Sequence, residues 1–198
     1  ARLVVKQIGV LGLQGAYAKH LAVLQQLDLK AVDVRKPEDL EECHGLIIPG
    51  GESTTMTKLI NEIDMHDALL KFSVDRPVFG TCAGMILMAA KVDDGRVKTL
   101  NLLDIEVERN AYGRQIDSFI HELDVTTNGQ AFSMRGVFIR APRIKNMGDG
   151  VEVLASVNGE PVLVQEGHHM AAAFHPELTG ETRIHNYFST LKGEMSLA

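Results

Sequence analysis

The chain contains the stretch PVFGTCAGM at residues 77–85, in which an apolar strand runs into Gly-x-Cys-x-Gly and then into a helix. A sharp strand-to-helix turn needs residues without side chains where the two elements nearly touch, and Gly80 and Gly84 meet that need. The pattern is the cysteine form of a nucleophile elbow, with Cys82 at its tip. The helix N-terminus beneath the sulfur favours thiolate over thiol, so Cys82 is a candidate nucleophile. The alternative is that Cys82 is an ordinary small buried residue.

Outward from this stretch, the first half of the chain alternates short apolar runs with helix-like segments. Apolar Leu21, Leu24 and Leu27 keep helical spacing, and Ser53 or Thr54 can cap the helix that follows the turn at 49–51. The expected strands are 7–11, 31–34, 45–48 and 77–79, and the expected helices are 17–27, 53–63 with room to continue to 72, and 83–90. This β-α-β-α order predicts an α/β fold with a mainly parallel central sheet flanked by helices.

The second half of the chain is richer in β structure. Turn signals such as Asn128-Gly129 and Asn158-Gly159 separate its short apolar runs. Strands are expected at 105–108, 119–125, 137–139, 151–157, 161–165 and 170–174, with a closing helix at 185–191. Because no low-complexity linker or repeat interrupts the chain, we interpret residues 1–198 as one domain with extra β strands in its C-terminal half.

Composition and charge limit the classes of partner. The 198 residues include 20 basic and 26 acidic side chains, which gives a net charge of −6, and 45% of the residues are hydrophobic. An acidic chain without a long basic run is a poor partner for nucleic acid or an anionic membrane. No apolar run approaches the ~20 residues of a membrane helix, and no signal-peptide pattern is present, so we expect a cytoplasmic protein. The two cysteines, Cys43 and Cys82, make neither a disulfide framework nor a zinc site.

A cysteine nucleophile needs a base, and His175 is the candidate. It follows the apolar run at 170–174 and precedes Pro176-Glu177, which places it at a strand end, where the sites of parallel α/β sheets gather. Glu177 can hydrogen-bond one ring nitrogen of His175 and hold the other nitrogen toward the sulfur. Cys82, His175 and Glu177 therefore form a predicted catalytic triad.

The other cysteine and the other histidines are interpreted as structural or surface residues. Cys43 lies beside Glu42, whose charge opposes a thiolate, so a structural role is expected. The adjacent pair His168-His169 lacks the spacing and the carboxylate or cysteine neighbours of a metal site, and no metal is expected. Surface positions are expected for the histidines in polar surroundings, which are His20, His66, His121 and His185.

The elbow and the His-Pro-Glu motif together resemble the class I, or triad, glutamine amidotransferases, whose fold is flavodoxin-like. Further segments resemble, more particularly, the family of glutaminase subunits of pyridoxal 5′-phosphate synthases, which serve vitamin B6 biosynthesis. The resemblance covers nearly the whole chain, and no expected catalytic position departs from it. The matching segments are IGVLGLQG at 8–15, PGGESTTM at 49–56, VERN at 107–110, GRQ at 113–115, DSF at 117–119, VFIRAP at 137–142 and FHPEL at 174–178.

The resemblance implies the triad named above, with Cys82 as nucleophile in the hydrolysis of L-glutamine to L-glutamate and ammonia. It also implies an oxyanion hole made by the backbone N–H groups of Gly51 and Ala83. An acid such as Glu52 suits the α-ammonium group of glutamine, and an arginine suits its α-carboxylate. The residues implied to contact L-glutamine are Gly51, Glu52, Ser53, Arg109, Ile139 and Arg140.

Gln14 lies in a glycine-containing loop after the first expected strand. The spacing of Gly9, Gly12 and Gly15 differs from the Gly-x-Gly-x-x-Gly of a dinucleotide site, so a nicotinamide or flavin cofactor is not expected. By resemblance, the loop lies near the active site and faces the synthase, and Gln14 completes the oxyanion hole once the partner docks. The alternative is a polar loop residue without that role.

The resemblance also implies a partner, a (β/α)8 synthase subunit that builds pyridoxal 5′-phosphate from sugar phosphates and the delivered ammonia. Glutaminase subunits would surround a synthase dodecamer. Pyridoxal 5′-phosphate is then the product of the complex, so no cofactor is expected on this chain. The alternatives are a triad glutaminase for a different synthase, a catalytically silent regulatory binding module, and a cysteine peptidase or thiol stress protein on a related fold.

Overall fold

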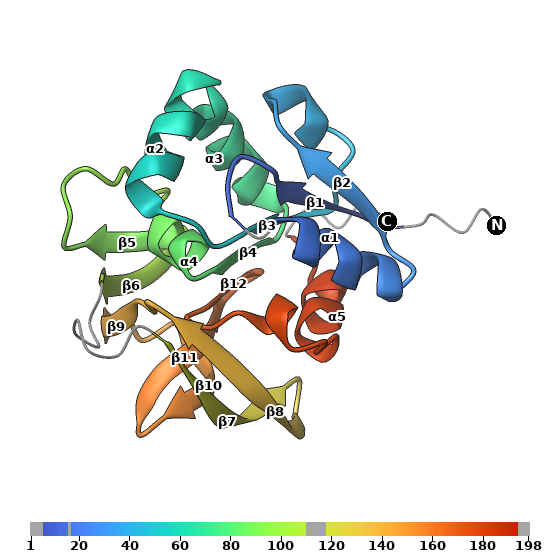
Figure 1. Cartoon of the computed structure of the whole chain (residues 1–198). Helices are drawn as coiled ribbons and strands as arrows, with labels where there is room; N and C mark the ends of the chain where they lie inside the picture. The colour runs from blue at the N-terminus through green and yellow to red at the C-terminus, as the bar shows by residue number, and fades with distance from the viewer. Residues whose placement is uncertain (1–5, 16, 110–117, 194–198) are drawn as a thin grey trace.

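The computed structural model describes residues 6–15, 17–109 and 118–193 (Figure 1). Asn110, the segment 113–115 and Asp117, which take part in the family resemblance, lie outside the described residues. The helices are α1 Tyr17–Gln26, α2 Ser53–Glu62, α3 Met65–Asp75, α4 Ala83–Met88 and α5 Arg183–Thr190, with the 3₁₀ helices η1 Pro37–Leu40 and η2 Pro176–Leu178. The strands are β1 Gln7–Leu11, β2 Lys30–Val34, β3 Gly45–Ile48, β4 Val78–Thr81, β5 Ala89–Val92, β6 Leu103–Glu108, β7 Ser118–Thr127, β8 Gln130–Ile139, β9 Arg143–Met147, β10 Glu152–Val157, β11 Glu160–Glu166 and β12 His169–Ala172. Each described helix is too short or too polar to cross a lipid bilayer.

The central sheet has seven strands in the order β10-β11-β12-β4-β3-β1-β2. Neighbouring strands from β12 to β2 are parallel, whereas β10 and β11 add an antiparallel edge. The carboxyl ends of the parallel strands therefore meet at one edge of the sheet, where sites of such folds form. The predicted α/β class with a mainly parallel central sheet is confirmed.

Helices cover both faces of the parallel strands. On one face, a Cβ at Gly45 of β3 would lie 3.2 Å from the ring of Phe188 on α5. Elsewhere, a Cβ at Gly84 of α4 would lie 2.0 Å from the carbonyl oxygen of Ile48 of β3, so this helix also packs closely on the sheet. In Figure 1 the central strands run between α2 and α3 on one side and α1 and α5 on the other. Burial on both faces explains why β3 and β4 are continuous apolar runs rather than alternating ones.

The N-cap of α2 differs from the prediction. Glu52, rather than Ser53 or Thr54, is the cap residue. Its carboxylate accepts the backbone N–H groups of Thr54 at 3.2 Å and Thr55 at 2.7 Å. A carboxylate in this place satisfies free N–H groups and opposes the positive end of the helix dipole, which explains why it displaces the hydroxyl residues.

Two expected helices are shorter than predicted. Asp64 has left-handed backbone angles, φ 54° and ψ 35°, which separate α2 from a new helix that begins at Met65. Asp and Asn tolerate this conformation better than most residues with a Cβ, so the continuous helix to residue 72 is wrong. The helix after the elbow ends at Met88, where the chain turns directly into β5 instead of continuing to residue 90.

The C-terminal half adds the predicted extra strands, together with some that were not predicted. β5, β6 and β9 form a three-stranded sheet, of which β5 and β9 were not expected. β7 and β8 form an antiparallel hairpin that is longer than expected and closes at Asn128-Gly129, both of which have positive φ. The expected strand at 170–174 ends at Ala172. Figure 1 shows the β7-β8 hairpin with β10 and β11 at the end of the molecule opposite α2 and α3.

Candidate active site

Cys82 lies between β4 and α4, at the carboxyl end of the central sheet. Its backbone has φ 53° and ψ −109°, which a residue with a side chain adopts only under constraint. A Cβ on Gly80 would lie 2.5 Å from the backbone of Gly84, and a Cβ on Gly84 would lie 2.0 Å from the carbonyl oxygen of Ile48. The close packing of strand and helix therefore depends on both glycines and holds the nucleophile elbow in its strained form.

The three residues of the predicted triad form one buried row. Cys82 Sγ lies 2.9 Å from His175 Nε2, and His175 Nδ1 lies 2.6 Å from Glu177 Oε1. His175 follows β12, the neighbour of β4 in the sheet, and Glu177 lies in η2, the 3₁₀ turn that Pro176 begins. The residues are 5%, 9% and 6% exposed, respectively, so little of the row is open to water.

The ring of His175 is placed to carry a proton. Burial lowers the pKa of His175, but hydrogen bonds and charge from Cys82 and Glu177 outweigh burial and raise this pKa to about 10. The carbonyl oxygens of Ala173 and Ile139, at 3.4 and 3.8 Å from Sγ, would accept from a thiol and so oppose a thiolate. The imidazole is nearer to the sulfur and has a carboxylate behind it, so the geometry favours a thiolate–imidazolium pair.

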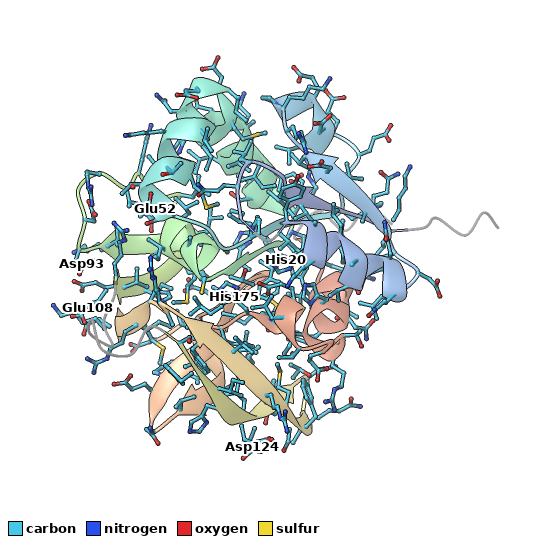
Figure 2. The ribbon with its side chains drawn as sticks, in the orientation of Figure 1. His20, Glu52, Asp93, Glu108, Asp124 and His175 are labelled. Atoms are coloured by element: carbon cyan, nitrogen blue, oxygen red, sulfur yellow. The ribbon has the colours of Figure 1, made fainter. Side chains whose placement is uncertain are left out.

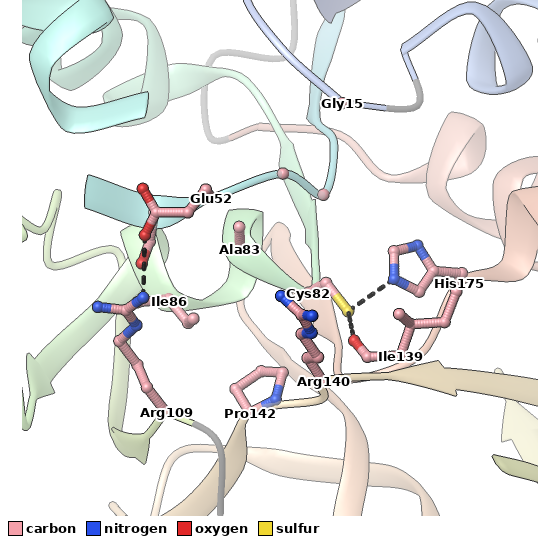
Figure 3. Close-up of a pocket in the computed structure, with 13 residues that line it drawn as sticks. Gly15, Glu52, Cys82, Ala83, Ile86, Arg109, Ile139, Arg140, Pro142 and His175 are labelled. Atoms are coloured by element: carbon pink, nitrogen blue, oxygen red, sulfur yellow. Dashed lines mark hydrogen bonds and ion pairs between the residues drawn. The ribbon is translucent and has the colours of Figure 1, made fainter. Parts of the chain in front are cut away.

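A cavity of about 460 Å³ opens beside Cys82 (Figure 3). Its size is typical of a small-molecule pocket. Every residue predicted to contact glutamine borders this cavity, as do the two predicted oxyanion donors Gly51 and Ala83, although these residues come from separate segments of the chain. The lining consists of Gly15, Gly50, Gly51, Glu52, Ser53, Cys82, Ala83, Ile86, Arg109, Ile139, Arg140, Pro142 and His175.

Four of the lining residues were not predicted, namely Gly15, Gly50, Ile86 and Pro142. Gly15, Gly50 and Pro142 lie inside segments that carry the family resemblance, and that was the signal available for them. Ile86 is an apolar residue in a short helix, and nothing in its local sequence distinguishes it from a core residue.

Arg109 and Glu52 form an ion pair at the edge of the cavity, with Arg109 Nη2 2.9 Å from Glu52 Oε1 (Figure 3). Arg109 also donates to Asp94, a partner that no sequence signal had marked. Partial burial raises the pKa of Glu52, but hydrogen bonds from Thr54 and Thr55 outweigh it and lower this pKa to about 2. Glu52 is therefore an ionised side chain that caps α2 and orients Arg109.

Gln14 lies against the turn that follows β3 and is not among the residues that line the cavity. Its Oε1 accepts the N–H of Glu52 at 2.9 Å, and a Cβ on Gly51 would lie 2.9 Å from the same oxygen. The next residue, Gly15, has φ +80°, and a Cβ there would lie 1.6 Å from the carbonyl oxygen of Gly50. The loop after β1 therefore supports the turn that carries Gly51, one of the two predicted oxyanion donors.

Ser53 borders the cavity with its hydroxyl enclosed. It is 2% exposed, and its Oγ is buried without a hydrogen-bond partner among the described residues. A buried hydroxyl without a partner costs free energy, and the residue that carries it lines the space next to the nucleophile. The side chain would have to rotate before this hydroxyl could reach a bound ligand.

The predicted surface positions of the histidines are only partly correct. His20 on α1 and His185 on α5 are both 0% exposed, so the expectation for these two is wrong. His66 and His121 are half-buried. His20 shares the buried face of α1 with Val23 and Leu24, and this helical spacing outweighs the polar neighbours on which the expectation rested.

The pair His168-His169 has a structural role in the fold. The Nε2 atoms of both rings lie 3.0 Å from the carbonyl oxygen of Ser73 on α3, and Nδ1 of His169 accepts the N–H of Val78. Within residues 6–15, 17–109 and 118–193, no three histidine, cysteine or acidic side chains gather as a metal site would require.

Comparison with known proteins connects this geometry to a family. The model of the SNO glutamine amidotransferase family matches residues 10–192. The pyridoxal 5′-phosphate synthase subunit PdxT of Pelotomaculum thermopropionicum is 51% identical over 183 residues, which are 92% of this chain and 93% of that protein. The subunit of the same name from Desulforamulus reducens is 50% identical over 182 residues, 91% of this chain and 96% of that protein. A crystal structure of a glutamine amidotransferase matches with a TM-score of 0.85 and 46% identity, covering 91% of this chain and 96% of that one.

Proposed function

The chain belongs to the SNO glutamine amidotransferase family, and from this premise we propose that it hydrolyses L-glutamine and delivers the ammonia to a pyridoxal 5′-phosphate synthase. The observation that carries the proposal is the buried row Cys82–His175–Glu177 at the edge of a cavity of about 460 Å³. The relatives named as subunits of that synthase, matched over more than nine tenths of the chain, support the choice of partner.

The first half of the reaction is an acyl transfer to Cys82. The thiolate attacks the side-chain amide carbon of glutamine, and a C–S bond forms as the carbonyl oxygen becomes negative. His175 then donates its proton to the amide nitrogen, the C–N bond breaks, and ammonia leaves a thioester behind. The 2.9 Å separation between Sγ and Nε2 and the raised pKa of His175 support this division of roles.

The second half of the reaction is hydrolysis of the thioester. His175, now neutral, takes a proton from water, and the resulting hydroxide attacks the acyl carbon. The C–S bond breaks, glutamate leaves and the thiolate–imidazolium pair is restored. Glu177 holds the imidazole in the tautomer whose Nε2 faces the sulfur, a role that its 2.6 Å contact with Nδ1 supports.

The negative oxygen of each tetrahedral state needs preorganised donors. The N–H of Ala83 follows the nucleophile directly at the start of α4, and Gly51 borders the same cavity on the turn after β3. We propose these two N–H groups as the oxyanion hole. Gln14 bonds the backbone next to Gly51, so a partner that moves its loop would change the orientation of that donor.

Glutamine carries an α-ammonium and an α-carboxylate group, so its recognition requires groups of both charges in the cavity. Arg109 and Arg140 border it and suit the α-carboxylate by charge-assisted hydrogen bonds. The Glu52 carboxylate attracts the α-ammonium group while its oxygens cap α2 and orient Arg109. Ser53 and the backbone at Ile139, which also border the cavity, complete the proposed contacts.

The partner in this proposal is a (β/α)8 synthase subunit, assembled as a dodecamer around which the glutaminase subunits sit. Ammonia released in solution at neutral pH is mostly protonated and is a poor nucleophile, so delivery within a complex preserves its reactivity. We propose one glutaminase domain, to which the family match over residues 10–192 lends support. The free thiols Cys43 and Cys82 suit a reducing, cytoplasmic location.

The test is release of glutamate from glutamine by the purified chain, alone and with a pyridoxal 5′-phosphate synthase subunit. We expect little release by the chain alone and a strong increase with the synthase, because docking completes the oxyanion hole. Strong release without the synthase would retain the triad and reject gating by the partner. No release in either case, with folded protein, would reject the glutaminase and favour a silent regulatory module.

A further inference from the structure

Two buried histidines lie behind the triad, on the side of Glu177 away from His175. His20 comes from α1 and His185 from α5, and both are 0% exposed (Figure 2 labels His20 and His175). Glu177 Oε1 is the partner of His175, whereas its Oε2 is buried without a hydrogen-bond partner among the described residues. Nε2 of His20 lies 3.6 Å from Oε2, and both side chains are fully enclosed.

The tautomers of the two rings follow from their contacts. His185 Nε2 lies 2.8 Å from His20 Nδ1, and His185 Nδ1 has no partner among the described residues. A buried N–H without an acceptor costs more than a buried lone pair without a donor, so the proton of His185 belongs on Nε2, from which it donates to His20. His20 Nδ1 is then an acceptor, and the proton of His20 belongs on Nε2, the atom that faces Glu177.

We infer that His20 is a positioning residue of the triad, because its Nε2–H faces the second carboxylate oxygen of Glu177 at 3.6 Å and attracts that carboxylate toward one orientation against His175. The inference rests on the proposed glutaminase function and extends it to a residue on α1. A carboxylate that bonds His175 through one oxygen and is drawn toward an N–H through the other is held in one rotamer, and it holds the imidazole in turn. His185 acts one step further away by setting the tautomer of His20.

Burial keeps the rings of His20 and His185 neutral. His20 therefore acts on Glu177 through a directed N–H group rather than through a positive charge. Burial lowers the pKa of His20 well below its usual range, and the nearby rings of His185 and His175 lower it further. Burial likewise lowers the pKa of His185 to about 4, although Glu181 opposes that shift. The hydroxyl of Thr81 lies 3.4 Å from His20 Nε2 and is a second acceptor for the same N–H.

The test compares His20→Leu, which fills the site without a donor, with His20→Gln, whose side-chain amide can place an N–H near the position of Nε2. Glutamine hydrolysis is measured with saturating synthase subunit. We expect kcat of His20→Leu to fall about 10- to 100-fold, the size of an effect from an unsatisfied charged group. KM for glutamine should stay within about 2-fold, because His20 lies outside the cavity. His20→Gln should recover most of kcat.

Several outcomes would overturn the inference. One is a His20→Leu protein with unchanged kcat, and another is a His20→Gln protein as slow as His20→Leu although thermal unfolding shows both to be folded. A His20→Leu protein with a raised KM for glutamine and an unchanged kcat would mean that His20 maintains the shape of the cavity instead of positioning the Glu177 carboxylate. Failure of the proposed function is distinguishable from all of these, because the wild-type complex itself would then release no glutamate.

Discussion

Cys43 and Cys82 lie at opposite ends of two neighbouring strands. Cys43 precedes β3 at the amino end of the parallel sheet, Cys82 follows β4 at the carboxyl end, and the two strands are paired. Both are free thiols with little exposure, 2% for Cys43 and 5% for Cys82. Burial is therefore common to both, and the difference in their chemistry must come from what each end of the sheet provides.

At the amino end, the thiol of Cys43 donates to the carbonyl oxygen of Asp39 at 3.3 Å. Burial raises the pKa of Cys43 to about 11, despite the opposing effect of the nearby Arg76 guanidinium. At the carboxyl end, Cys82 meets the imidazole of His175 at 2.9 Å and begins a helix. The comparison teaches that the two thiols differ in one feature suited to nucleophilic chemistry, a base within hydrogen-bond reach that follows an adjacent strand.

The largest difference between Cys43 and Cys82 should be in their importance for catalysis. Cys82→Ala should reduce glutamate release in the presence of the synthase subunit by at least about 10⁴-fold, as removal of a triad nucleophile does elsewhere. Cys43→Ala should stay within about 2-fold of the wild-type rate, since the side chain is outside the cavity. Coupled glutamate dehydrogenase assays of the two variants give the comparison directly. Persistent hydrolysis by folded Cys82→Ala would mean that another group performs the attack.

The second difference between the two cysteines should be in their reactivity toward an electrophile. This difference can be measured without the synthase subunit. Iodoacetamide at pH 7 should modify Cys82 about 10³-fold faster than Cys43, because a thiol with a pKa near 11 is almost entirely protonated there. Timed quenching followed by mass spectrometry of the two peptides gives both rates from one sample. A matched His175→Asn protein should slow modification of Cys82 and leave Cys43 unchanged. Equal rates for the two cysteines in the wild type would break the comparison.

The carboxyl end of the sheet was largely predictable from sequence, because its function depends on local patterns. Gly80 and Gly84 mark the elbow, and the apolar run before His175 marks a strand end. Parallel strands bring such ends together whatever their separation along the chain. The charged residues around the cavity needed the family resemblance, since nothing local distinguishes Arg109 from an exposed arginine.

What could not be predicted depends on contacts between distant segments. His20 and His185 have polar neighbours in sequence, and the packing of α1 and α5 against each other and against β4 buries them. The left-handed backbone at Asp64 and the change from α4 into β5 likewise end helices where the helical periodicity alone would have continued them. The two roles of Glu52, as a helix cap and as the partner of Arg109, appear only when α2 and β6 are placed side by side.

The third difference is between two glycines, and it concerns the backbone that supports the turn at the carboxyl end of the sheet. Gly15→Ala would place a Cβ 1.6 Å from the carbonyl oxygen of Gly50, so the turn that carries Gly51 must move. We expect glutamine hydrolysis to fall about 100-fold, the effect of a displacement of about 1 Å in an active site. Steady-state kinetics with the synthase subunit measure it.

The matched control for this prediction is Gly159→Ala. Gly159 has the same φ of +80°, but a Cβ there meets no atom within 4 Å. That variant should lose only about 1 kcal/mol of stability from its strained backbone and keep full activity. If both variants had equal activity, the contact between Gly15 and Gly50 would not be needed to place the turn that carries Gly51, the proposed oxyanion donor.

The smallest difference should be in the pH dependence of stability, and it belongs to Cys43. Its pKa is raised from 9.0 to about 11 in the folded chain. Between these values the unfolded chain loses the thiol proton while the folded chain keeps it, so this contribution is complete below pH 9 and is lost as pH rises toward 11. The loss should amount to about 2 kcal/mol.

The measurement is urea unfolding of wild type and Cys43→Ala at several pH values from 8 to about 10.5. Other groups titrate in this range, but they are common to both proteins and cancel in the difference between the two free energies of unfolding. That difference should shrink as pH rises, because only the wild type has a thiol to deprotonate. A difference that does not change with pH would mean that the amino end of the sheet does not hold the Cys43 proton, and the contrast between the two ends of the sheet would then lose its support from Cys43.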